Sequence, residues 1–329
     1  MKRESSCGEG ANLRRFLKLR GWGLFYAAGA AWVRAGGSGR WLMPVPDYAT
    51  SDPEPGELEA LLREHRMLAL RYRALHQSGI PSGLYVCREK RYSMRDVCSS
   101  YRQAVRRGLQ RSEVRPVGKR ELLTEGLECN RDTMVRQQRW DPEFGDARRW
   151  ERFVDAAFQA PGVEVTGAFV EGQLAAYQVG CLDDGWWSIL HAFSRTHLRV
   201  HHPNHALMFY AIERQIRRPE VSAVCAGPRT LFSDNGLHAF KTRIGFRVEP
   251  CEVVVRLHPW LEPLVSSQTA RNVLRMVQRA RPGATGWQRA AAILGSVRKA
   301  AYSSASAGGP GRWGSGRGAD PTGLKEGET

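Results

Sequence analysis

The chain has 329 residues, of which 42% are hydrophobic and 25% are charged, values that are ordinary for a globular protein. Its formal net charge of +16 is high, but the excess lies at the ends: residues 1–40 carry +6, residues 265–329 carry +7, and residues 41–264 carry only +3. Because the centre is nearly neutral, the total does not indicate a nucleic-acid-binding fold, and we expect no specific DNA binding.

The cysteines and the N-terminal pattern bear on localisation. The seven cysteines are odd in number and include no C-x-x-C pair, so buried thiols in a reducing, cytoplasmic setting are the favoured interpretation.

Residues 21–33 form an apolar run after several basic residues, and this run is too short to span a bilayer. We expect a surface helix or an interfacial anchor there, with a signal peptide as the alternative. Membrane association would use the basic ends, which suit anionic lipid.

The N-terminal third divides near residue 50. Residues 1–50 are a basic, Trp- and Gly-rich segment that ends in the extended stretch WLMPVPDY, where two prolines exclude a helix. Residues 51–111 are expected to be the helical N-terminal part of a catalytic unit. Leucines that recur near every 3.6 residues predict a helix over 56–77. A strand or strand-turn over 84–94 and a second helix over 95–110 follow.

Residues 112–258 alternate between strand and helix patterns. Pro116 lacks a backbone donor, so the first strand is expected at a sheet edge. Turn residues at 171–172 and 183–185 join three later strands into an antiparallel meander. The expected elements are strands at 112–118, 163–170, 173–181, 186–193, 221–226 and 247–257, and helices at 119–138, 146–159, 204–217 and 236–244.

The C-terminal part looks like an addition. Residues 259–302 read as basic helices that are separated by a Pro-Gly pair. Residues 303–329 are rich in Gly and Ser and contain few apolar groups. Such a segment cannot bury enough apolar surface to offset its chain entropy, so a disordered tail is expected.

Three motifs in the centre resemble a known family. The sequence AFVEGQLAAY occupies 168–177, the polar loop and apolar helix SRTHLRVHHPNHALMFYAIE occupy 194–213, and LHAFKTRIGF occupies 237–246. In this order and spacing they resemble the FemAB-like branch of the GNAT superfamily. The resemblance implies an α/β fold with a mixed sheet, the GNAT acyl-CoA N-acyltransferase fold, with helical additions at both ends. It would make residues 112–258 the GNAT-like domain.

The resemblance also implies a place for the acyl donor. In GNAT proteins the third meander strand and the next parallel strand separate, and the pantetheine arm of the donor lies between them. Its pyrophosphate rests on the opening of the following helix, where unpaired N–H groups and the helix dipole favour an anion. The donor-binding candidates are therefore Ser194, Arg195, Arg199, His202, Asn204 and His205.

The loop departs from the pattern of acetyl-CoA enzymes, which usually show Q/R-x-x-G-x-G/A. This chain has no glycine between 186 and 226. FemAB-like members often lack the signature too, and some take the acyl group from aminoacyl-tRNA. Acyl-CoA as donor substrate and aminoacyl-tRNA therefore both stay open, and no bound cofactor is expected.

The catalytic candidates are Lys241, Tyr210 and Asp234. The lysine of the F-K element lies near the reacting carbonyl in Fem-type enzymes, and a cation there could stabilise an oxyanion. The alternatives are that Lys241 is a surface lysine, that Tyr210 belongs to the core and that Asp234 caps a helix. Tyr210 would act as a general acid, and Asp234 would accept the amine proton. The spacing of His201 and His205 suggests a metal, but no acidic partner lies near in sequence, so no metal site is expected.

These patterns predict an N-acyltransferase that moves an acyl group from acyl-CoA, or from aminoacyl-tRNA, to an amine acceptor. The alternative is a non-catalytic protein of the same fold that binds a phosphate-bearing ligand or an anionic membrane surface. A nucleic-acid-binding protein is a third possibility, which the nearly neutral centre weakens.

Overall fold

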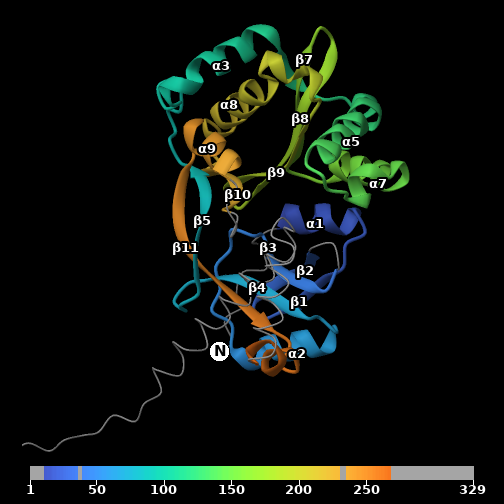
Figure 1. Ribbon diagram of the computed structural model, residues 1–329, viewed down its shortest axis with the longest axis vertical. Helices are drawn as coiled ribbons and strands as arrows, with labels where there is room; N and C mark the ends of the chain where they lie inside the picture. The colour runs from blue at the N-terminus through green and yellow to red at the C-terminus, as the bar shows by residue number, and fades with distance from the viewer. Residues whose placement is uncertain (1–10, 36–38, 230–234, 268–329) are drawn as a thin grey trace, which may run out of the picture.

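The computed structural model describes residues 11–35, 39–229 and 235–267, and one mixed sheet of eleven strands runs through this part of the chain (Figure 1). The strands are β1 (Leu24–Ala27), β2 (Ala30–Ala35), β3 (Trp41–Val45), β4 (Ala69–Ala74), β5 (Ile80–Cys87), β6 (Glu113–Pro116), β7 (Val163–Val170), β8 (Gln173–Asp183), β9 (Trp186–Ser194), β10 (Ala223–Pro228) and β11 (Arg247–Leu257). Their order in the sheet is β1-β2-β3-β4-β11-β5-β10-β9-β8-β7-β6. The pairs β3–β4 and β9–β10 are parallel, and the other named pairs are antiparallel.

Helices cover both faces of this sheet. They are α1 (Ala11–Leu19), α2 (Pro55–Glu64), α3 (Ser99–Arg111), α4 (Lys119–Glu121), α5 (Leu127–Arg136), α6 (Pro142–Gly145), α7 (Ala147–Gln159), α8 (Pro203–Ile216), α9 (Asn235–Arg243) and α10 (Leu261–Ser266), with the π-helical turn η1 (Leu122–Gly126) and the 3₁₀ turn η2 (His197–His201). One core cluster joins α1, α5 and α7 to strands β7–β9, and a second joins α3 and α8 to β5, β9 and β10. Figure 1 shows these two helical layers on either side of β7, β8 and β9.

The central half of the chain has the predicted elements. Strands β7, β8 and β9 form the expected antiparallel meander, and the first turn places Glu171 and Gly172 at φ values of 51° and 79°. Strand β6 lies at one end of the strand order, which confirms the edge position. Helix α7 begins as predicted at Asp146, whose carboxylate accepts a hydrogen bond from Arg149 N at 3.0 Å.

The N-terminal third differs from the sequence-based prediction. The helix expected over 56–77 ends at Glu64, because Arg66 adopts a left-handed φ of 53° and a strand follows. In that strand, β4, side chains alternate, so that Leu70 and Tyr72 are buried against α2 while Arg71 and Arg73 share the other face. The stretch ALRYRA, residues 69–74, alternates with a period of two, but it overlaps the leucine pattern that predicted the helix over 56–77.

Residues 21–33 do not form the expected surface helix or interfacial anchor. They fold into the hairpin β1–β2, and Trp32 and Val33 are buried in the core. The helices expected between 268 and 302 and the disordered tail at 303–329 lie outside the described residues. None of the described helices combines the length and the apolar character that crossing a bilayer requires.

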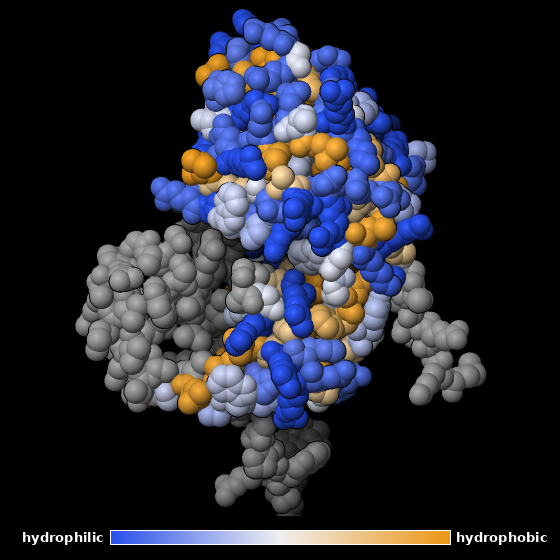
Figure 2. Space-filling view, turned by 90° about the vertical axis from the view of Figure 1, so that its right-hand side faces the viewer, coloured by the Kyte–Doolittle hydropathy of each residue, from blue (hydrophilic) through white to orange (hydrophobic). Residues whose placement is uncertain are grey.

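Strand β11 joins the N-terminal strands to the rest of the sheet. Its first part, 247–253, pairs with β5, and its second part, 252–257, pairs with β4. The face shown in Figure 2 is mostly hydrophilic in its upper part, with apolar residues in small separate groups. Large exposed apolar side chains such as Val135 and Trp140 are of the kind that ordinary protein surfaces carry singly.

Candidate functional site

The central feature of the site is the separation of two parallel strands. Strands β9 and β10 are paired only where residues 186–188 face residues 223–225. Beyond this point β9 continues beside β8 to Ser194, whereas β10 continues beside β5 to Pro228. The two strands therefore open in the way that the resemblance implies. Between their ends lies a backbone edge that pairs with no strand in the part of the chain that the structure describes.

A β-bulge marks the same place on β9. The register passes from Gly180 opposite Ile189 to Val179 opposite His191, so Leu190 is an extra residue in β9. Ile189 packs with the cluster beside α8, while Leu190 packs with the cluster on the opposite face. A bulge reorients backbone N–H and C=O groups and is common next to active sites. This edge can thus offer backbone hydrogen bonds to a ligand that enters between the strands.

Helix α8 begins directly beside this opening. Its N-cap residue, His202, adopts the left-handed φ of 57°, and Pro203 occupies the first helical position. His202 O already accepts hydrogen bonds from His205 N at 3.0 Å and from Ala206 N at 3.3 Å. The opening of α8 therefore has fewer spare amides than the first turn of a helix usually has.

Two candidate donor ligands meet at the start of α8. The Ser194 hydroxyl is buried and accepts a hydrogen bond from Asn204 Nδ2 at 3.2 Å. The same hydroxyl accepts from Arg136 Nη2 at 3.2 Å, and Arg136 Nη1 donates to Thr196 Oγ1 at 2.7 Å. Arg136 and its neighbour Asp132, which accepts from Thr196 N at 2.8 Å, hold the loop in place. The only sequence feature that pointed to Arg136 was a basic run near the end of α5.

Arg195 lies elsewhere than expected. Its side chain is 9% exposed and forms ion pairs with Glu125 at 3.4 Å and with Glu128 at 2.6 Å. Its Nε donates to Leu174 O at 3.0 Å. The guanidinium is therefore engaged between α5 and strand β8, and it does not point to the opening of α8 as a phosphate ligand would. Arg199, by contrast, is exposed on η2.

His205 contributes an aromatic contact. Its ring lies 5.4 Å from the ring of His202, 5.1 Å from Tyr101 and 5.2 Å from Phe240. Burial, followed by the charges of His202 and Arg199, lowers the pKa of His205 to about 4. The imidazole is thus neutral at pH 7. It joins α3, α8 and α9 next to the opening but adds no positive charge there.

Lys241 lies at the point where β9 and β10 separate. Its Nζ donates to Ala226 O at 2.5 Å and lies 4.5 Å from the centre of the Tyr85 ring. Ala226 directly follows Cys225, the last residue of β10 that pairs with β9. The structure therefore brings one predicted catalytic group, Lys241, to the mouth of the opening.

Of the other two catalytic candidates, only Tyr210 lies within the described residues. The Tyr210 hydroxyl accepts a hydrogen bond from Arg214 Nη1 at 3.1 Å on the half-exposed side of α8. Arg214 in turn lies 3.9 Å from Glu164, near the start of β7. Asp234 lies outside the described residues. No group of three or more His, Cys, Asp or Glu within the described ranges is arranged to hold a metal ion.

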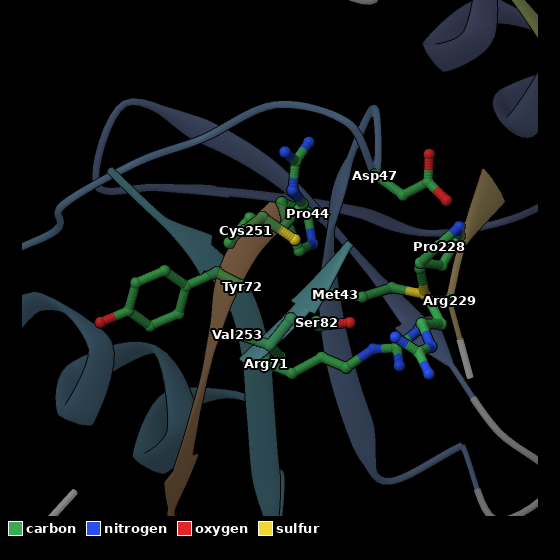
Figure 3. Close-up of a pocket in the computed structure, with 11 residues that line it drawn as sticks. Met43, Pro44, Asp47, Arg71, Tyr72, Ser82, Pro228, Arg229, Cys251 and Val253 are labelled. Carbon is green, nitrogen blue, oxygen red and sulfur yellow. The ribbon is translucent and has the colours of Figure 1, made fainter. Parts of the chain in front are cut away.

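A cavity on the other side of β10 was missed at the sequence level. It has an empty volume of about 430 Å³ that is partly open to solvent (Figure 3). It lies between the loop after β3, the ends of β5 and β10, and strands β4 and β11. Its lining residues are Met43, Pro44, Asp47, Arg71, Tyr72, Arg73, Ser82, Pro228, Arg229, Cys251 and Val253. The usable signal was the pair Arg71 and Arg73, which a strand places on one face.

Asp47 links this cavity to Lys241. Burial raises the pKa of Asp47, and the positive charges of Arg71, Arg73 and Lys241 oppose this rise only in part. The same Lys241 charge, together with Asp47, acts on the buried Cys225 thiol of β10, whose pKa burial raises to about 12. The cavity and the opening between β9 and β10 are therefore neighbours, and their charged groups influence one another.

Comparisons with known proteins agree with this geometry. Residues 95–241 match the family described as Acetyltransferase (GNAT) domain. The crystal structure of FemX superposes with a TM-score of 0.52 at 12% sequence identity, over 79% of this chain and 94% of that chain. No curated protein matches the sequence.

Two more distant structures are also similar. L-PGS from Bacillus licheniformis gives a TM-score of 0.46 at 13% identity, over 77% of this chain and 93% of that chain. A tandem GNAT protein from the clavulanic acid biosynthesis pathway gives 0.43 at 13% identity, over 70% and 78%. Residues 95–241 thus match the GNAT acetyltransferase domain family, and the chain has a fold similar to that of FemX.

Proposed function

We propose that this protein is an N-acyltransferase that moves an acyl group from acyl-CoA to an amine acceptor, with aminoacyl-tRNA as the alternative donor. The observation that carries the proposal is the hydrogen bond of Lys241 Nζ to Ala226 O, at the point where β10 leaves β9 and the bulged part of β9 begins. An acyl carbonyl that enters between the strands would meet backbone donors on one side and an ammonium group on the other. Both kinds of group stabilise negative charge on a carbonyl oxygen.

The reaction assigns simple tasks to these groups. The neutral amine attacks the acyl carbon, a C–N bond forms, and negative charge develops on the carbonyl oxygen. The charge is stabilised by Lys241 and by the edge of β9. The nitrogen, which becomes positively charged on attack, loses a proton, and the C–S bond, or the ester C–O bond of a tRNA donor, breaks while the leaving group takes up a proton. The amine and the donor approach from the two sides of the opening.

The phosphate end of the donor is proposed to lie at η2 and the start of α8. Arg199 is exposed there, and Asn204 is fixed by its hydrogen bond to Ser194. Arg195 is left out of this set because Glu125 and Glu128 hold it. The neutral His205 ring suits contact with the apolar pantetheine arm better than contact with a pyrophosphate.

The test uses the purified full-length chain. Acetyl-CoA, longer acyl-CoAs and a charged aminoacyl-tRNA are each incubated with a mixture of amines, and N-acyl products are identified by mass spectrometry. A product that forms only with enzyme and only from one donor class supports the proposal and selects the donor. Donor binding is measured by calorimetry for Arg199→Ala and for Arg217→Ala, an exposed arginine at the far end of α8 that pairs with Glu213.

We expect Arg199→Ala to weaken donor binding by about 10-fold, as the loss of one charged hydrogen bond does, and Arg217→Ala to leave it unchanged. Equal affinities in the two variants would remove η2 from the donor site. Donor binding without any product would favour the second candidate, a non-catalytic binding protein.

A further inference from the structure

The cavity beside β10 has a charge pattern that the transfer chemistry does not use. Three arginines, Arg71, Arg73 and Arg229, line it together with one carboxylate, Asp47. Figure 3 shows the Arg71 side chain extending along the cavity toward the end of β10, where Pro228 and Arg229 lie. The lining therefore carries an excess of positive charge in a hollow at the edge of the proposed active site.

Arg71 and Arg73 are partly buried, whereas Arg229 is exposed, and the two buried ones differ from other partly or fully buried arginines of the protein. Arg20, Arg195 and Arg218 each form an ion pair with a glutamate at 2.5–2.7 Å. Across residues 11–35, 39–229 and 235–267, the structure gives no such ion pair to the three cavity arginines. Arg71 and Arg73 have lost part of their hydration, and the one carboxylate of the lining, Asp47, is the charged group that both of them share.

Arg73 gives the clearest sign that a partner is missing. Its Nη1 donates to Tyr48 O, but its Nε is buried and has no hydrogen-bond partner within the described chain. Burial also lowers the pKa of Arg71, and the Asp47 charge opposes this effect. Both guanidinium groups would be stabilised by an anion, since planar arginine donors match the oxygen pairs of carboxylate and phosphate groups.

We propose that this cavity binds a carboxylate or phosphate group of the acceptor substrate through Arg71, Arg73 and Arg229. This inference rests on the proposed function and names the class of its acceptor: an amine that carries an anionic group. Bound in this way, the anionic end lies among the arginines, and the amine end extends past Asp47 toward Lys241. Asp47 faces the ammonium form of the amine, so the single carboxylate of the cavity has a counterpart too.

Anion binding is measured first, without any acyl donor, so that it does not depend on transfer. Phosphate and glutarate are the probes, titrated by calorimetry at constant ionic strength against chloride. The variants are Arg71→Gln, Arg71→Lys and Arg63→Gln. Arg63 is the matched control because it is an exposed arginine on α2 that pairs with Glu59 four residues before it. Circular dichroism and thermal melting report whether each variant is folded.

We expect Arg71→Gln to weaken probe binding by about 10- to 100-fold, which corresponds to the loss of charged hydrogen bonds. Arg71→Lys should fall between the wild type and Arg71→Gln, and Arg63→Gln should bind like the wild type. The stronger of the two probes identifies the anion as phosphate or carboxylate. The inference is overturned if Arg71→Gln and Arg63→Gln bind the probes equally, or if the wild type binds neither.

Transfer assays then separate this inference from the proposed function. Phosphoethanolamine is compared with ethanolamine, and 5-aminopentanoate with pentylamine. We expect the anionic member of one pair to be acylated with a KM at least about 10-fold lower, and Arg71→Gln to remove this preference. Equal use of charged and uncharged amines would overturn the acceptor site while leaving acyl transfer intact. Anion binding that is lost in Arg71→Gln, with no transfer to any amine, would retain the anion site and overturn the proposed function.

Discussion

The close contact between α3 and α8 offers a sharp test of how the donor site is held. Gly108 lies in α3, facing the start of α8, and it is buried there. A Cβ atom at this position would come within 2.6 Å of His202 O and 3.1 Å of Ala206 Cβ. His202 O is the acceptor for the first two amide bonds of α8, so Gly108→Ala must move the backbone that opens this helix.

Two effects of opposite sign set the expected magnitude. Replacing glycine by alanine inside a helix stabilises it by up to about 1 kcal/mol. Forcing an extra methyl group into a packed contact costs about 1–3 kcal/mol. Gly56 in α2 supplies the comparison, because a Cβ atom there meets nothing within 4 Å. We therefore expect the free energy of unfolding of Gly108→Ala to lie about 1–3 kcal/mol below that of Gly56→Ala.

Urea unfolding measures this difference if both variants keep the m-value of the wild type. Calorimetric titration with the acyl donor measures the second consequence, since a shifted His202 should weaken donor binding in Gly108→Ala alone. Two variants of equal stability and equal donor affinity would refute the idea that the Gly108 contact positions the start of α8.

Two further predictions concern residues near the same opening. Arg195→Met should lower the free energy of unfolding by about 1–3 kcal/mol, because Leu174 O and the partly buried Glu125 each lose a charged donor. Arg217→Met, at an exposed site, should change it by less than about 0.5 kcal/mol. If the two losses are equal, the Arg195 network does not stabilise the fold. His205 has a pKa of about 4 in the folded protein and near the ordinary histidine value of 6.5 when unfolded, so the unfolded state binds more protons between these values. The free energy of unfolding should therefore rise from pH 4 to pH 6.5. His205→Phe keeps an aromatic ring at this position and should show a smaller rise when the free energy is measured by urea unfolding over this range. The same pH dependence in the variant and the wild type would contradict the lowered pKa of His205.

The sequence allowed a good prediction of the central strands and helices because their signals are local. Alternating apolar residues, the turn at Glu171 and Gly172 and the cap at Asp146 each lie within a few residues of the element that they define. Lys241 was selected through the resemblance of its motif, and although its Nζ contacts Ala226 O at the end of β10, its catalytic role stays a prediction.

The missed parts depend on contacts between distant segments. The cavity combines Asp47, Arg71, Ser82, Arg229 and Cys251, which come from five different strands or loops. No spacing along the chain brings them together, because the pairing of β11 with both β4 and β5 creates their common face. The helix predicted over 56–77 failed for a related reason: pairing with β3 and β11 outweighs the helical propensity of the leucine-rich stretch.

Arg195 shows a limit of a different kind. Its position in a basic loop before a helix is compatible with a phosphate ligand and equally with a buried ion pair. Glu125 and Glu128 form the ion pairs that hold Arg195, and they lie about seventy residues earlier in the chain. They reach Arg195 only because η1 and α5 pack on β8.

The single-turnover rate of acyl transfer by Lys241→Ala tests the central claim most directly. Lys119→Ala is the control, since Lys119 is an exposed lysine that pairs with Asp155 far from the opening. If Lys241 stabilises the oxyanion at the point where β9 and β10 separate, its loss should lower the rate by about 100- to 1,000-fold while donor binding is retained. A rate for Lys241→Ala that equals that of Lys119→Ala would contradict the proposed site.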